Sequence, residues 1–253
     1  MAIDLILYIL AIFLGLVLTQ EIFHRFPKFS LAFFTIASII FFPCWALLIG
    51  VDNWFGWVKV LSIATGIIWL SLLRTTKLGE TKLCQWSVYF FLVVNIFEAV
   101  LKDMQTGNIA SYFNVASGLL LIATLAKINT IHICKQGQHK DLHWGGMTLS
   151  WIIGYTLWNW VFVYLNLGES AIPHLAVLGS ALLIGFIDKQ RWLQARAFTL
   201  GTYFIIFHSF PHLTPSPFSG GYDNQAGLAM SLLTVGFMTV YTIVYLRRST
   251  SDN

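Results

Sequence analysis

Long apolar runs dominate this chain and limit what it can fold into. A helix that crosses the hydrocarbon core of a bilayer needs about 20 mostly apolar residues. Nine segments of the 253-residue sequence approach that length. Their expected bounds are 3–20, 30–50, 54–73, 84–102, 108–129, 146–167, 170–187, 193–212 and 226–246. The sequence therefore predicts an all-α, polytopic transmembrane helical bundle of about nine transmembrane helices.

Composition supports a membrane class and a single domain. The chain is 57% hydrophobic and 10% charged, whereas soluble domains carry about 25% charged residues. No polar stretch is long enough for a separate soluble domain, so we expect one integral membrane domain over residues 1–253. The first run has no basic residues before it and no small-residue cleavage site before Glu21. We therefore expect it to remain as a transmembrane helix rather than a cleaved signal.

The distribution of lysine and arginine predicts an orientation. With nine spans, 13 of the 15 basic residues fall on one side of the membrane. Positive residues accumulate on the cytoplasmic side, so we expect the N-terminus outside and the C-terminus in the cytoplasm. Because the basic residues are scattered between apolar runs, they do not form a phosphate-binding stripe, and no nucleic-acid partner is expected.

The two basic residues on the outer side are Lys59 and Lys102. Lys59 is expected about 7 Å below the outer end of its span, at 1.5 Å per residue. An ammonium group at that depth is costly unless it is paired. The next span returns outward and places Glu98 at a similar depth, which predicts a Lys59–Glu98 ion pair. Asn95 shares a helix face with Glu98, and Asp103 follows at the helix exit.

Other spans bring polar and aromatic side chains to the same level. We therefore predict an aromatic-lined pocket open to the outer face. We divide its residues into a binding set, expected to contact the ligand, and a surrounding set, expected to support the first. The binding set is Lys59, Asn95, Glu98, Asn114, Tyr155, Trp158 and Asn159. The surrounding set is Lys102, Asp103 and His174. The alternative is structural, because polar side chains in membranes also join helices through hydrogen bonds of about 0.6 kcal/mol each.

A second cluster of polar residues is expected at the cytoplasmic side, and most of them would anchor the helices at the membrane interface. A pairing of the Glu21–Arg196 type is possible there, but the sequence does not choose the partners. The members of this group are Glu21, His24, Arg25, Arg74, Arg191, Gln194 and Arg196.

Candidate metal and cofactor sites are weak. His208 and His212 form an HxxxH that could share zinc on a helix, but Pro211 disturbs the helix there and no HExxH motif is present. Interfacial histidines are the expected reading, with no metal and no cofactor. A cytoplasmic His/Cys group has no zinc spacing; its members are His132, Cys134, His139 and His143. All three cysteines, Cys44, Cys84 and Cys134, are expected as free thiols.

Several strings together suggest a family. They are Trp57-Val58-Lys59-Val60, Asn95-Ile-Phe-Glu98-Ala-Val with Asp103, Tyr155-Thr-Leu-Trp158-Asn159 with Val163-Tyr164, and Trp192-Leu193-Gln194-x-Arg196-Ala197-x-Thr199-Leu200. With them the chain resembles an uncharacterised family of bacterial polytopic membrane proteins, a domain of unknown function, from Glu21 to about Phe207. The resemblance implies a multi-pass protein of the bacterial inner (plasma) membrane and no known activity.

Three classes of function remain open. The leading one is binding, sensing or transport of a small or lipidic ligand through the outward-facing pocket, with membrane lipids as partners. The second is an intramembrane enzyme that acts on lipids of the outer leaflet, with Glu98 or Asp103 as general base. The third is a structural or assembly subunit whose polar residues only pack helices.

Overall fold

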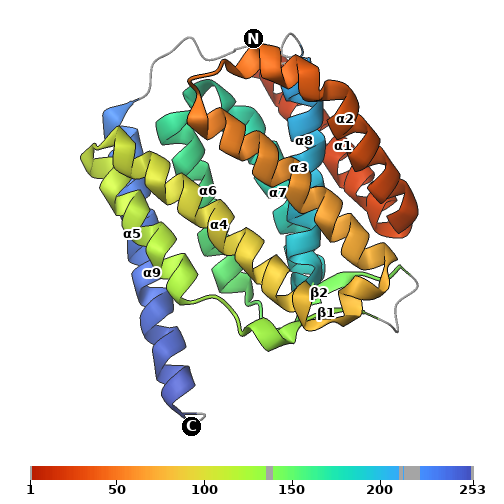
Figure 1. Ribbon diagram of the computed structural model, residues 1–253. Helices are drawn as coiled ribbons and strands as arrows, with labels where there is room; N and C mark the ends of the chain where they lie inside the picture. Colours follow the sequence, from red (N-terminus) through yellow and green to blue (C-terminus); the bar gives the residue numbers. More distant parts are fainter. Residues whose placement is uncertain (1, 135–138, 211–212, 214–222, 252–253) are drawn as a thin grey trace.

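The computed structural model describes residues 2–134, 139–210, 213 and 223–251 (Figure 1). Long helices make up most of this part of the chain. They are α1 Ala2–Arg25, α2 Pro27–Ile49, α3 Trp54–Thr75, α4 Lys82–Thr106, α5 Ile109–Ala123, α6 Leu149–Asn166, α7 Ala171–Ile187, α8 Trp192–Ser209 and α9 Asn224–Ser251. Short 3₁₀ turns connect some of them: η1 Lys77–Glu80, η2 Ile128–Thr130, η3 Gly168–Ser170 and η4 Lys189–Arg191. The predicted all-α class is confirmed.

The helices run alternately between two ends of one bundle (Figure 1). One end, here the hairpin end, carries a short antiparallel hairpin of β1 Ile131–Ile133 and β2 Leu142–Trp144. The opposite end, here the cavity end, holds the last turns of α2, α4, α6 and α8 and the first turns of α3, α5 and α7. The N-terminus lies at the cavity end and the C-terminus at the hairpin end. In the packing, α5 lies against α4 and α9, whereas α1 lies against α7 and α8.

The helices differ in length, and this bears on the number of membrane spans. Five of them, α1, α2, α3, α4 and α9, are long and apolar enough to cross a membrane. Their outward faces carry exposed aliphatic side chains such as Leu47 (86% exposed) and Leu233 (74%), which suits contact with lipid. The shorter α5 has 15 residues and α7 has 17. At 1.5 Å per residue, α5 is about 22 Å long, less than the roughly 30 Å hydrocarbon thickness.

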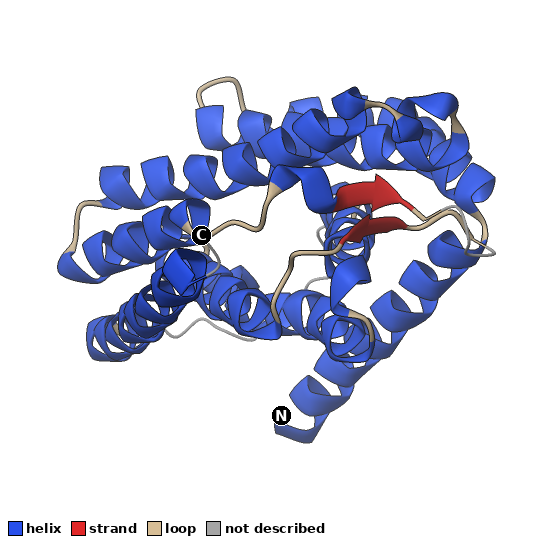
Figure 2. Cartoon of the chain, turned by 90° about the horizontal axis from the view of Figure 1, so that it is seen from below, coloured by secondary structure: helices blue, strands red, loops and turns tan. Residues whose placement is uncertain are grey.

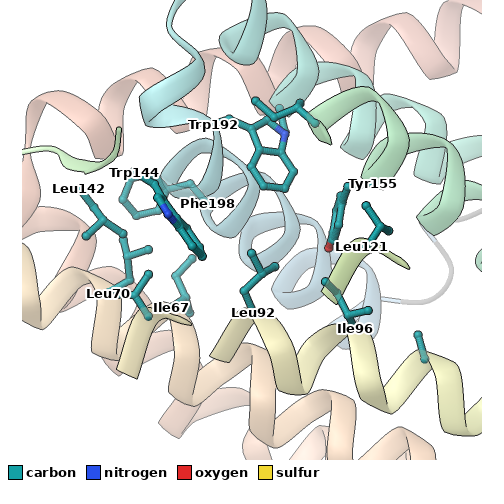
Figure 3. Close-up of a cluster of buried hydrophobic side chains, with 14 of the residues drawn as sticks. Ile67, Leu70, Leu92, Ile96, Leu121, Leu142, Trp144, Tyr155, Trp192 and Phe198 are labelled. Atoms are coloured by element: carbon teal, nitrogen blue, oxygen red, sulfur yellow. The ribbon is translucent and has the colours of Figure 1, made fainter. Parts of the chain in front are cut away.

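Aromatic and aliphatic side chains fill the centre of the bundle. Trp151, Trp158 and Trp192 are among the largest fully buried residues. The Tyr155 ring packs edge-on against Trp192, with ring centroids 5.0 Å apart. In Figure 3, Trp192 and Leu92 of α4 lie on opposite sides of the buried cluster. This aromatic layer lies between the two ends of the bundle.

The described part of the segment between the predicted spans 108–129 and 146–167 contains buried residues. The predicted span 108–129 is too long, because α5 ends at Ala123 and the chain then enters η2 and β1. Ile131 and Ile133 are buried and His132 between them is exposed, which is the two-residue alternation of a half-buried strand. Seen from below in Figure 2, the two strands lie across this end of the bundle.

A buried ion and hydrogen-bond network fixes the hairpin to the helices. The Arg74 guanidinium donates to the backbone carbonyls of Phe23 (2.9 Å) and His24 (2.7 Å) and lies 3.4 Å from the Asp141 carboxylate. Further bonds from Arg74 reach the carbonyls of two hairpin-loop residues, His139 and Lys140. Asp141 also accepts from Gln194 at 2.6 Å and lies 2.7 Å from His24 Nδ1.

The carboxyl group of Asp141 titrates well below its ordinary range. Burial alone would raise its pKa, but the hydrogen bonds from His24 and Gln194 and the positive charges of His24 and Arg74 lower the pKa to about 2. Arg74, His24 and Gln194 are therefore buried network members rather than interface anchors. The suggested Glu21–Arg196 pairing is wrong, because Glu21 pairs with Arg25 at 2.7 Å.

Candidate functional site

A cavity of about 650 Å³ lies at the cavity end, between α2, α3, α4, α6, α7 and α8. Its walls combine aromatic rings with an unusual number of polar groups. The polar lining is Asn53, Lys59, Asn95, Lys102, Asn159, Asn166, Ser170, His174, Arg196 and His208. The aromatic lining is Phe55, Phe162, Tyr203, Phe204 and Phe207.

The Lys59–Glu98 ion pair predicted from the sequence is present. Lys59 Nζ lies 2.8 Å from Glu98 Oε2, and the Ser62 hydroxyl donates to the same oxygen at 3.3 Å. The ammonium groups of Lys59 and Lys102 lie 5.6 Å and 6.0 Å from the centroid of the Phe55 ring. Two cations thus lie over one aromatic ring, and each is attracted by the partial negative potential of the ring face.

On the other side of the cavity, three residues from three helices meet. Asn159 Oδ1 accepts a hydrogen bond from Arg196 Nη2 at 3.2 Å and lies 3.0 Å from His174 Nε2. All three residues are buried. The Nε and Nη1 atoms of Arg196 have no hydrogen-bond partner in the part of the chain that the structure describes.

Some predicted site residues support the cavity without lining it. Asp103 accepts from the side-chain amides of Asn114 (2.7 Å) and Asn166 (2.6 Å). The Trp158 indole donates to the backbone carbonyl of Asn114 at 3.1 Å. Of this group only Asn166 reaches the cavity surface. Asn114, Trp158 and Asp103 therefore join α4, α5 and α6, as the structural alternative expects for such polar residues.

A second, smaller cavity of about 100 Å³ adjoins the first. Its lining is mostly apolar and comes mainly from α3, α4 and α8, with Gly66, Phe91 and Leu92 among the residues. Tyr155 also lines it, and its hydroxyl donates to Asn95 Oδ1 at 3.3 Å. The two cavities share the residues Ile63, Asn95, Arg196 and Leu200. The small cavity therefore lies beside the large one, and Arg196 is part of the wall of both.

Arg196 is the main site residue that sequence reasoning placed elsewhere. Its backbone lies near the hairpin end, in the second turn of α8, but its side chain reaches Asn159. A signal exists in the helix spacing: Arg196, Leu200, Tyr203 and Phe207 follow at i, i+4, i+7 and i+11 and all line the cavity. Asn53, Ser170 and Asn166 were also missed, because each lies at a helix end where polar residues are common.

The histidines and cysteines do not assemble a metal site among the described residues. There, no group of three or more His, Cys, Asp or Glu side chains could hold a metal ion. His208 lines the cavity and stacks on Phe204 with ring centroids 4.1 Å apart, whereas His212 lies outside the described residues. Cys44, Cys84 and Cys134 are free thiols, as expected.

The fold and the cavity define a helical membrane protein with a polar, cation-lined chamber at one end of the bundle. The chain belongs to a family of unknown function (DUF5692), whose model matches residues 1–253. This confirms the resemblance to an uncharacterised family, now over the full sequence. No curated protein and no solved structure matches the chain.

Proposed function

We propose that the protein binds a small or lipidic ligand in the 650 Å³ cavity, either to sense it or to transport it. The observation that carries this proposal is a ligand-sized space with charged groups buried in its walls. Pockets for small molecules have volumes of about 300–1,000 Å³, with mostly apolar walls and a few convergent polar groups. A bundle whose polar residues served only to pack helices would fill this space.

The second part of the proposal is the orientation and the location. The alternating helices favour nine crossings, with the cavity open to the outside and the C-terminus in the cytoplasm. The loops at the hairpin end then carry the cytoplasmic excess of lysine and arginine. The shorter α5 and α7 would cross a locally thinner region, at a modest energetic cost. The proposed location is the inner membrane of a bacterial cell, as a multi-pass protein.

Enzymatic action on outer-leaflet lipids has less support than binding. A general base needs a carboxylate that is free to take a proton. Glu98 is held by Lys59 and Ser62, and both oxygens of Asp103 accept amide hydrogen bonds. Both carboxylates already have polar partners, which gives catalysis less support than binding.

Sensing and transport differ in what must happen at the hairpin end. A carrier exposes its site alternately to the two sides of the membrane. One turn before Arg196, the fully buried Trp192 packs against Trp151 and Tyr155. Transport would require this aromatic layer and the Arg74–Asp141 network to open, whereas sensing needs neither change.

A cavity-filling variant tests the proposal. Leu200 lines both cavities, so Leu200→Trp should obstruct the space where they adjoin. Leu233→Trp on the exposed face of α9 is the matched control. We expect wild-type protein purified in mild detergent to retain close to one ligand molecule per chain, measured by extraction and mass spectrometry. Leu233→Trp should retain the same amount and Leu200→Trp several-fold less. Equal ligand content in the two variants, or none in the wild type, would contradict binding in the cavity.

A further inference from the structure

We infer that the cavity binds an oxyanion, a carboxylate or phosphate group of its ligand, at the guanidinium of Arg196. This inference rests on the proposed function, because it names the chemical class of the ligand for the same cavity. Anionic lipid headgroups and free phosphate share this chemistry. The evidence consists of the unused donors of Arg196, the balance of charge around it and the apolar space beside it.

The first observation is the incomplete hydrogen bonding of a buried cation. Arg196 is 4% exposed, and a guanidinium offers five N–H donors. Its side chain makes one hydrogen bond, from Nη2 to Asn159, and Nε and Nη1 donate to no described residue. Buried charges in proteins are normally paired. Arg196 lines the cavity, and its two buried, unused donors therefore point to an anion as the missing partner.

The second observation is the charge of the cavity wall. Its lining includes the cationic side chains of Lys59, Lys102 and Arg196 and contains no Asp or Glu among the described residues. Glu98 lies behind Lys59 and neutralises that one charge. No described Asp or Glu forms an ion pair with Arg196. A cavity lined by charges of one sign, with low-dielectric walls, attracts ions of the opposite sign.

The third observation favours an anion that carries an apolar chain. Arg196 lines the polar cavity and the small apolar cavity at once. An oxyanion held at Arg196 would therefore have an apolar continuation beside it, among Gly66, Phe91 and Leu92. An amphiphile matches both spaces, whereas inorganic phosphate would leave the apolar cavity empty.

The test compares three probes on the full chain in neutral detergent. Dioctanoyl phosphatidate carries both the phosphate and the acyl chains, dioctanoylglycerol carries only the chains, and inorganic phosphate carries only the anion. We expect wild-type protein to bind dioctanoyl phosphatidate about tenfold or more tightly than dioctanoylglycerol in isothermal titration. Binding of inorganic phosphate at a comparable affinity would also support the oxyanion site and would identify a water-soluble ligand as the source. Equal affinity for the phosphatidate and the diacylglycerol, without phosphate binding, would overturn the inference.

Variants of Arg196 assign the effect to its guanidinium. Arg196→Gln should remove most of the preference for phosphatidate, and Arg196→Lys should keep part of it, since a lysine retains the charge but loses the planar fork. Arg25→Gln is the control, because Arg25 is an exposed arginine at the hairpin end, and it should leave the preference unchanged. A preference that survives in Arg196→Gln would overturn the assignment. If Arg196→Gln does not fold, Arg196→Lys and the wild-type probes still decide the matter.

The cavity-filling variant separates failure of this inference from failure of the proposed function. If Leu200→Trp abolishes binding of phosphatidate and diacylglycerol alike, and the wild type does not distinguish them, the cavity binds a ligand but the oxyanion inference is wrong. If Leu200→Trp leaves the binding of both lipids intact, the lipids bind elsewhere and both proposals fail.

Discussion

Gln194 and Arg196 lie two residues apart in α8 and have entirely different partners. Gln194 donates to Asp141 at 2.6 Å and accepts from the backbone N–H of Leu142 at 2.8 Å. Arg196 reaches Asn159 in the cavity instead. Two residues along a helix correspond to a rotation of about 200°, so such side chains point to nearly opposite sides. A cluster of polar residues at a helix end can therefore belong to two separate sites.

This explains which site residues the sequence could predict. The Lys59–Glu98 pair could be predicted from the sequence because both residues lie in apolar runs at matching depth, where an unpaired charge is costly. The role of Arg196 could not be predicted from the sequence, because its long side chain carries the guanidinium away from the level of its backbone. The roles of Asn114 and Trp158 depend on which neighbour each one faces, which the spacing of residues along one helix does not determine.

Replacing Glu98 tests the ion pair at the level of single residues. Glu98→Gln removes the charge that Lys59 Nζ approaches at 2.8 Å. We expect a loss of stability of about 1.5–3 kcal/mol, the range for hydrogen bonds to charged groups, seen as a lower melting temperature in detergent. The double variant Lys59→Met with Glu98→Gln should recover part of the loss, since the Lys59 ammonium that lost its partner is then also removed.

A surface pair provides the control for Glu98→Gln. Glu21 pairs with Arg25 at 2.7 Å, and the Arg25 side chain is 60% exposed. Exposed pairs of this kind contribute about 0–1 kcal/mol, so Glu21→Gln should change the melting temperature little. Equal effects of Glu98→Gln and Glu21→Gln would show that the Lys59–Glu98 pair has no special role.

At the level of elements, the hairpin is the feature that helical periodicity alone did not predict. Its strands are three residues each, too short for a clear alternating pattern in a sequence rich in apolar residues. The helices and most of their bounds were easier to predict, because an apolar run of about 20 residues is a strong sequence signal. The end of α5 at Ala123 depends on the hairpin that follows it, so the longer span 108–129 was predicted instead.

The Asp141 network makes the stability of the hairpin end dependent on pH. Asp141 has a pKa of about 2 in the folded protein, below its ordinary value of 3.8. A lowered carboxyl pKa stabilises the folded state above about pH 4, and this contribution is lost as the pH falls towards 2. We expect the melting temperature of the wild type to exceed that of Asp141→Asn at pH 5–7, and the difference to shrink between pH 4 and pH 2.

The matched control for Asp141→Asn is Asp52→Asn, in an exposed loop at the cavity end. Asp52→Asn should leave the melting temperature close to that of the wild type across the same pH range. A constant difference between the wild type and Asp141→Asn down to pH 2 would mean that the Asp141 carboxylate does not stabilise the fold through its charge.

For the whole molecule, the proposed orientation places the cavity outside the cell and the hairpin inside. This can be measured by single-cysteine labelling of intact cells, in a chain whose Cys44, Cys84 and Cys134 are replaced. A membrane-impermeant maleimide should label Asp52→Cys, at the cavity end, in intact cells. It should label Lys82→Cys, at the start of α4, only after the cells are opened. The reverse pattern would place the cavity on the cytoplasmic side.

The central proposal is that a ligand occupies the cavity beside Arg196, and an experimental density map tests it most directly. The protein would be purified from its native membrane without added ligand and its structure determined in lipid nanodiscs. We expect non-protein density within hydrogen-bond distance of Arg196 Nε or Nη1, extending towards Phe91 and Leu92. A collapsed cavity, in which a protein side chain takes up those two donors of Arg196, would contradict the proposal.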